Sequence, residues 1–299
     1  MRMTASQDWL REGMLAAGLV GLLLCSMFLA TGSFPPMVVV ESGSMMHDLD
    51  DGAVGSIDPG DLILVMNPNR VEIITYVEAK QVGNENYGYE SLGMEGDVII
   101  YRKNGGSDTP IIHRALLKAV AETTAPALGG ACTAGVYDGL EDICVLTWSV
   151  PGTNQSNVEE ISMTLDYSCA PHGNLVIDSW VPNHEGYLTT GDNYRTNGCT
   201  IDQLRATSSD ADEQWIRSRG LKDENGNPVT AVRDIWIEGI SATEIPWIGA
   251  IKLFVSGTSS SVTSKSWSNL GLLFASVIAA PMLYEAIIEN RKTDSDEEE

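Results

Sequence analysis

The chain has 299 residues, of which 43% are hydrophobic and 20% charged, and it carries a formal net charge of -23. This length allows one large or two medium domains with a real hydrophobic core. So acidic a composition argues against nucleic acid as a partner, because binding to phosphates requires a basic surface. It fits a strongly solvated exterior, such as salt-adapted proteins have, but identifies no partner by itself.

The first predicted element is an uncharged apolar run over residues 13–30. Its length approaches the roughly 20 residues that a membrane-spanning helix needs. We therefore expect a cytoplasmic N-terminus over residues 1–12 and a transmembrane helix over residues 13–30, with Cys25 as a buried thiol inside it. A cleavable signal peptide ending at Ala30 or Gly32 is the alternative, although the apolar core of such peptides is usually only about 7 to 15 residues long.

The sequence predicts a mainly β body over residues 31–266. Short β-branched or apolar runs alternate with turns rich in Gly, Pro and Asn, which is typical of strands joined by loops. The strands are expected at residues 38–40, 62–65, 71–77, 98–101, 110–117, 144–150, 175–181 and 187–190. Helical spacing appears at residues 208–219, and short apolar runs return over residues 236–255. The segment 121–185 is expected to be an insertion.

The predicted body contains four cysteines, Cys132, Cys144, Cys169 and Cys199. An even number in an exterior domain is typical of disulfides, and four cysteines allow three pairings. We predict Cys132 with Cys144, closing a short loop, and Cys169 with Cys199, tying the insertion to the turn that follows it. A zinc site is the alternative, but the sequence gives these cysteines no C-x-x-C or histidine-paired spacing. We expect no metal and no cofactor.

A second uncharged apolar run covers residues 270–284, and Trp267 stands before it like an anchor at a membrane interface. Pro281 inside the run predicts a bent or tilted helix. We expect a transmembrane helix over residues 267–288 and an acidic cytoplasmic tail over residues 289–299. Because Arg and Lys residues flank the outer ends of both apolar runs, both termini are expected on the cytoplasmic side and the body outside.

A candidate nucleophile lies where the β-branched run at residues 38–40 ends in a small-residue turn containing Ser42 and Ser44. A serine hydroxyl attacks poorly until a base takes its proton, and histidine is the usual base. Of the four histidines, His113 alone lies within an apolar strand, a costly place for a polar ring without a partner. His47 is expected to point away from Ser44 or to contact the turn. A plain turn serine and a core histidine bonded to backbone are the alternatives.

The order of the motifs resembles that of type I signal peptidases, in the archaeal and endoplasmic-reticulum branch where histidine replaces the lysine base of most bacterial members. The matching segments are Ser42–Gly43–Ser44–Met45, Gly60–Asp61–Leu62–Ile63–Leu64–Val65, Gly96–Asp97–Val98–Ile99–Ile100–Tyr101, Pro110–Ile111–Ile112–His113–Arg114, Gly191–Asp192–Asn193 and Ile245–Pro246–Trp247–Ile248–Gly249–Ala250. Each is weak alone, and their order carries the resemblance over about a third of the chain. The chain departs from the family at Met46–His47, where Glu–Pro is common, and in the long loop before Gly60.

The resemblance implies a signal-peptidase-like antiparallel β body with an inserted cysteine-bearing segment, flanked by two membrane helices. It implies Ser44 as nucleophile and His113 as general base, with a carboxylate from Asp202 or Asp192, of which Asp202 is slightly favoured. The backbone N–H of Ser44 and the hydroxyl of Ser42 would stabilise the oxyanion. Residues lining the substrate site would be Val38, Val39, Val40 and Met45, where an extended peptide pairs with the strand.

The implied protein is a membrane-anchored serine endopeptidase that removes signal peptides from secreted preproteins on the outer face of the cell membrane. Its expected partners are secretory preproteins, membrane lipid and the protein-translocation machinery. One alternative is a Ser–Lys peptidase of the bacterial kind with Lys103 or Lys118 as base, which would require a desolvated neutral lysine. Another alternative is a non-catalytic β domain held at the cell surface for binding.

Overall fold

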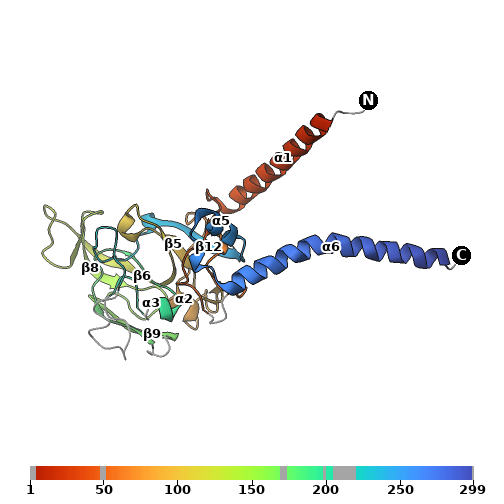
Figure 1. The fold of residues 1–299 in the computed structure, drawn as a ribbon. Helices are drawn as coiled ribbons and strands as arrows, with labels where there is room; N and C mark the ends of the chain where they lie inside the picture. The colour runs from red at the N-terminus through yellow and green to blue at the C-terminus, as the bar shows by residue number, and fades with distance from the viewer. Residues whose placement is uncertain (1–4, 48–51, 169–173, 198–199, 205–219, 298–299) are drawn as a thin grey trace.

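Two long helices extend from a β body in the computed structural model, which describes residues 5–47, 52–168, 174–197, 200–204 and 220–297. Helices α1 (Ala5–Thr31) and α6 (Ser264–Glu297) leave the body on the same side, and both chain ends lie far from it (Figure 1). The predicted Cys169–Cys199 pair and the predicted helix at 208–219 lie outside the described residues.

The body is built on an antiparallel sheet with strand order β1-β2-β12-β5-β6-β8-β7, and β11 also pairs with β6. Its strands are β1 (Met37–Val39), β2 (Leu62–Met66), β5 (Val98–Tyr101), β6 (Ile111–Pro126), β7 (Val136–Asp138), β8 (Ile143–Ser149), β11 (Gly186–Thr190) and β12 (Ile237–Ile245). Two hairpins form separate two-stranded sheets, β3 (Glu90–Ser91) with β4 (Met94–Glu95) and β9 (Ile161–Ser168) with β10 (Asn174–Trp180). The predicted mainly β body is confirmed.

The predicted strand at residues 71–77 is wrong. Residues 71–75 belong to no strand, and helix α2 (Tyr76–Lys80) begins within the β-branched run. The reason is a capping box, in which the N–H of Thr75 donates to the Glu78 carboxylate at 2.9 Å. Such a pair satisfies otherwise unpaired donors at a helix start, and here it outweighs the strand propensity of the apolar side chains.

The apolar runs at residues 236–255 form β12 and then a helix that the sequence did not predict, α5 (Gly249–Ser256). One face of α5 buries Ala250 and Leu253 against the start of α6. The other face leaves Phe254 and Val255 exposed, at 68% and 81%. The Phe254 ring also meets Trp267 of α6 edge-on at 6.0 Å, so an apolar surface continues from the base of α6 onto α5.

Both long helices have a stretch that is long and apolar enough to cross a membrane, residues 9–31 in α1 and 264–285 in α6. The α1 stretch stands clear of the body, and Cys25 is a free cysteine on its surface that no other part of the protein covers among the described residues. Helix α6 passes through Pro281 and curves gently rather than breaking (Figure 1). Both helices are longer than the predicted spans.

The predicted Cys132–Cys144 disulfide is confirmed, with the two sulfur atoms 1.97 Å apart. It joins the loop before β7 to strand β8. The segment expected to be an insertion is continuous with the sheet, since β6 runs unbroken through residue 121. Its strands also supply much of the largest core cluster, including the fully buried Trp148 and Ile161.

Candidate active site

Ser44 lies on a tight turn directly after β1. The strand's end is fixed to the neighbouring chain by backbone hydrogen bonds from Val40 N–H to the Asp61 carbonyl (3.0 Å) and from Gly60 N–H to the Val40 carbonyl (2.9 Å). Met45, the next residue, is 1% exposed and packs in a core cluster with Val40. Since the residues on both sides are anchored, the half-buried Ser44 is presented at the strand end.

His113 on β6 makes a close contact with Asp202. Its Nδ1 atom lies 2.6 Å from Asp202 Oδ2, and both side chains are almost fully buried. The same carboxylate oxygen accepts hydrogen bonds from the Thr189 hydroxyl (2.6 Å) and the Tyr101 hydroxyl (3.0 Å). Burial and the nearby charge of Asp202 raise the pKa of Tyr101 well above its usual value, so its phenol stays protonated and donates.

This contact fixes the tautomer of His113. The Asp202 carboxylate already accepts hydrogen bonds from two hydroxyls and acts as the acceptor here too, so His113 donates from Nδ1, and its Nε2 lies at Gly191, away from Asp202. Sequence reasoning found the Asp202 partner but missed Thr189 and Tyr101, which orient it. Their residue types carry no distinguishing signal in the sequence, because many strands contain a threonine or a tyrosine.

Asp192 takes a different position, on the other side of the sheet. Successive side chains of a strand point to opposite faces, so His113 and Arg114 diverge. Arg114 binds Asp192 through Nε (3.0 Å to Oδ1) and through its terminal nitrogen (2.6 Å to Oδ2). Asp192 also accepts hydrogen bonds from Tyr167 and from His47. Asp202 therefore faces His113, and Asp192 does not.

Gly191 places Ser44 and the free nitrogen of His113 side by side. A β-carbon on this glycine would lie 3.0 Å from His113 Nε2, 3.3 Å from the Ser44 β-carbon and 2.6 Å from the Ser44 carbonyl oxygen. Any other residue would force these groups apart. The Gly191 position therefore needs a hydrogen in place of a side chain, and the serine and the histidine share that gap.

The Ser44 hydroxyl hydrogen-bonds to the Ser42 hydroxyl at 3.2 Å. Within the described part of the chain it makes no hydrogen bond to His113, so the expected Ser44–His113 bond is absent from this rotamer. The backbone N–H of Ser44 likewise has no hydrogen-bond acceptor among the described residues. A hydroxyl donor and a backbone donor thus stand two residues apart on the same exposed turn.

A groove of about 480 Å³ opens beside Ser44 and His113. One wall is the β1 region, with all four of the predicted substrate-contacting residues, Val38, Val39, Val40 and Met45. The segment 109–112, at the start of β6, also lines the groove. β1 is also the end strand of its sheet, so its second backbone edge pairs with no strand among the described residues.

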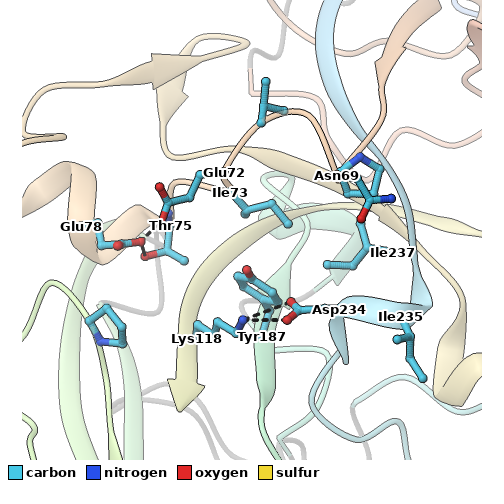
Figure 2. A pocket seen from close by; sticks show the side chains of 13 residues that line it. Asn69, Glu72, Ile73, Thr75, Glu78, Lys118, Tyr187, Asp234, Ile235 and Ile237 are labelled. Carbon is cyan, nitrogen blue, oxygen red and sulfur yellow. Dashed lines mark hydrogen bonds and ion pairs between the residues drawn. The ribbon is translucent and has the colours of Figure 1, made fainter. Parts of the chain in front are cut away.

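The two lysines considered as alternative bases are both ion-paired. Lys103 lines the same groove, but its Nζ lies 2.5 Å from Asp108. Lys118 lies in a larger cavity of about 680 Å³ that shares no lining residue with the groove, and Figure 2 shows it directed at Asp234, 2.9 Å away. Burial lowers the pKa of Lys118, but the hydrogen bond to Asp234 and nearby negative charges outweigh this and raise it. Lys118 is therefore not the neutral amine that a Ser–Lys mechanism requires, and the Lys103 side chain is held by the Asp108 carboxylate.

The remaining histidines lie apart from the Ser44 hydroxyl or outside the described residues. His184 bonds the Glu185 carbonyl (2.8 Å) and the Thr230 hydroxyl (3.0 Å), and His172 is not described. His47 is bound to Asp192. Across the described residues, no group of three or more His, Cys, Asp or Glu side chains could hold a metal ion.

No known family model, curated protein or solved structure matches this chain significantly.

Proposed function

We propose that this protein is a membrane-anchored serine endopeptidase that removes signal peptides from secreted preproteins. One observation carries the proposal: Ser44 and the Nε2 atom of His113 flank the same gap at Gly191, while Asp202 holds Nδ1 at 2.6 Å. The three residues come from separate segments of the chain, each fixed by its own contacts. The sequence resemblance to type I signal peptidases supports the same assignment.

The arrangement suits acyl transfer. Rotation of the Ser44 hydroxyl from Ser42 towards His113 lets Nε2 take its proton as the oxygen attacks the substrate carbonyl carbon. Asp202 stabilises the resulting imidazolium, which then gives that proton to the leaving amine as the peptide bond breaks. A water molecule next attacks the acyl-serine, with His113 again accepting the proton, and this releases the signal peptide and restores Ser44.

The oxyanion of each tetrahedral intermediate needs donors in place before it forms. The Ser44 N–H and the Ser42 hydroxyl have the required position, on the turn that presents the nucleophile. Once Ser44 turns towards His113, the Ser42 hydroxyl is released to donate. Removing one such donor in other hydrolases costs about 2.7 to 4 kcal/mol of transition-state stabilisation.

The groove suits an extended peptide. A substrate strand between β1 and the Thr109–Ile112 segment would pair with the free edge of β1 and place its side chains against Val38 and Val40. The membrane helices suit a substrate that is itself anchored by an apolar segment. β1 begins six residues after α1 ends, so the cleavage site would lie near the membrane surface, and the translocation machinery is a further expected partner.

The test is cleavage of a preprotein by the full chain in lipid vesicles. Wild-type protein should release the mature product, and Ser44→Ala should not. The matched control is Ser107→Ala, which changes a serine that bonds Glu224 away from the Ser44 turn and should retain activity. Binding of the peptide without cleavage by the wild type would favour the non-catalytic binding domain, and activity lost in Lys103→Ala but kept in His113→Ala would favour the Ser–Lys alternative.

A further inference from the structure

A second histidine–aspartate pair stands beside the Ser44 turn. His47, three residues after Ser44, has its Nε2 atom 2.6 Å from Asp192 Oδ2, and the Asp192 side chain is completely buried. Arg114 and Tyr167 hold the same carboxylate. The catalytic roles proposed above do not use this pair, yet it lies on the loop that carries the nucleophile.

The bonding of His47 does not suit a general base. Burial raises the pKa of Asp192, but the charge of Arg114 and hydrogen bonds from His47 and Arg114 outweigh it and hold that pKa well below its usual range. An ionised carboxylate only accepts hydrogen bonds, so the Nε2 of His47 must be the donor. Its Nδ1 lies against Gly93, where a β-carbon would come within 3.0 Å. Both ring nitrogens are therefore directed at groups other than Ser44.

The pair completes a clamp between two turns. Asn193 donates from its backbone N–H to the Ser44 carbonyl (2.9 Å) and from its side chain to the Gly43 carbonyl (2.7 Å). Gly191 packs against Ser44. Residues 191–193 thus hold the backbone of Gly43 and Ser44 through Asn193 and Gly191. Asp192, between them, holds the loop three residues later by its bond to His47.

Asp192 is held in place by the buried side chain of Arg114. Arg114 is fully buried, and its other terminal nitrogen, Nη1, donates to carbonyls in and next to the β3–β4 hairpin, among them Gly96 at 2.6 Å and Ser91 at 3.0 Å. Arg114 therefore fixes the Asp192 carboxylate, which also accepts a hydrogen bond from His47. Met45 anchors the residue after Ser44 in the core, and the His47 N–H donates to the Ser56 hydroxyl at 3.2 Å. The His47–Asp192 bond is a further side-chain contact that ties this loop to the sheet, and a single substitution can remove it.

We propose that His47 is a positioning residue, which fixes the turn of Ser44 by donating Nε2–H to Asp192. This inference rests on the proposed peptidase function. Without the contact, His47 loses its side-chain link to the sheet while Met45 stays buried, and the Ser44 N–H and hydroxyl are held less firmly at their angle to the substrate carbonyl. Displacing a reacting group by about 1 Å can cost on the order of 100-fold in rate.

The test compares three substitutions in the full-length protein. His47→Ala removes the donor, His47→Asn places an amide too close to the backbone to reach Asp192, and His47→Gln places an amide nitrogen near the Nε2 position. We expect kcat to fall about 10- to 100-fold in the Ala and Asn variants with little change in KM, and His47→Gln to recover most of the loss. His184→Gln, at a buried histidine outside the proposed site, is the control for general packing and should leave kcat unchanged.

Hydrogen exchange gives a readout that does not depend on catalysis. The amide of Asn193, bonded to the Ser44 carbonyl, should exchange faster in His47→Ala and His47→Asn than in the wild type, and His47→Gln should restore its protection. Unchanged exchange at Asn193, or a kcat within about twofold of wild type in His47→Ala, overturns the positioning role. A wild type that cleaves no preprotein overturns the proposed function instead, and the exchange data then still decide whether His47 fixes the turn.

Discussion

In the proposed mechanism Ser44 and His113 act in the same proton transfer, so the effects of removing them should not add. Ser44→Ala and His113→Ala should each lower kcat on the order of 10⁴-fold or more, and the double variant should be little worse. Ser42→Ala removes the proposed oxyanion donor and leaves the proposed nucleophile, so the loss of kcat should be smaller, about 10²- to 10³-fold. Single-turnover cleavage of a preprotein measures all four variants, and additive losses would show that the two residues act in separate steps.

Substitution of Asp202 should lower activity, whereas substitution of Asp192 should lower folding stability. Asp202→Asn keeps a side chain of nearly the same shape beside Tyr101 and Thr189 but disturbs the tautomer of His113, so a folded protein with kcat lowered on the order of 10⁴-fold is expected. Asp192→Asn leaves the buried Arg114 guanidinium without its charge partner, which should cost about 3 to 5 kcal/mol of folding free energy. Thermal unfolding and kcat together distinguish the outcomes, and equal stabilities of the two variants would contradict the assignment.

Residues of the candidate site could be predicted from the sequence where a distinctive side chain stands in a recognisable local pattern. Ser44 follows a β-branched strand, and His113 is a polar ring inside an apolar one, so both could be singled out. The partner of His47 could not be found, because Asp192 is 145 positions away and nothing local indicates the contact. The choice between Asp202 and Asp192 depends on the opposite directions of His113 and Arg114, which only becomes decisive once the strand register is known.

At the scale of elements, the disulfide should stabilise one end of the body without serving the site. The bridge between Cys132 and Cys144 closes a loop with a sequence separation of 12, worth about 3 kcal/mol in the chain-entropy model. Cys132→Ala removes the bridge and keeps the buried Cys144 side chain in place. Amides of β7 should then exchange faster while preprotein cleavage is retained. Cys25→Ala, at a free cysteine on α1, is the control and should change neither property.

Strand β12 carries a carboxyl group that should make stability depend on pH. Burial raises the pKa of Glu244 to about 7, with the charge of Asp61 adding to the effect and a hydrogen bond from Gly55 opposing it. Since the folded-state pKa lies above the ordinary value of 4.5, the folded state binds this proton more tightly. Its stabilising contribution is therefore complete below that ordinary value and is lost as the pH rises through about 7.

Glu244→Gln should remove that part of the pH dependence. The fall in unfolding temperature between about pH 5 and pH 8 should be smaller in the variant than in the wild type. Glu238→Gln, on the same strand but ion-paired with Arg102 at the surface, is the matched control and should keep the wild-type slope. Identical slopes in Glu244→Gln and wild type would show that Glu244 does not titrate in this range.

Strands and helices were predicted correctly where the sequence shows a single secondary-structure pattern, and wrongly where strand and helix signals overlap. The strands β2, β5 and β11 are short apolar runs that follow turn residues, and the structure has them. Residues 71–77 are equally β-branched, but the Thr75–Glu78 pair starts a helix there. Helix α5 was missed because a run of eight residues is too short for helical spacing to stand out, and its burial against α6 depends on contacts distant in sequence.

At the scale of the whole molecule, the two long helices would set the orientation of the β body relative to a membrane. Both leave the same side of the body, and each has an apolar stretch long enough to cross (Figure 1). The exposed apolar face of α5 lies at the base of α6, where a bilayer surface would cover it. If both helices span, the two chain ends lie together on the side opposite the body. Arg2, Arg11, Arg291 and Lys292 near those ends favour the cytoplasmic side.

Cysteine labelling in intact cells tests this topology. A cysteine at Leu128, which is 74% exposed on the body, should react with a membrane-impermeant maleimide added from outside. A cysteine at Asp294, beyond the α6 span, should react only after the membrane is permeabilised, because the bilayer separates it from the reagent. Reaction at residue 294 in intact cells would place the tail outside and contradict a crossing by α6. Protection of residue 128 together with reaction at 294 would invert the whole molecule and put the proposed site on the wrong side for secreted substrates.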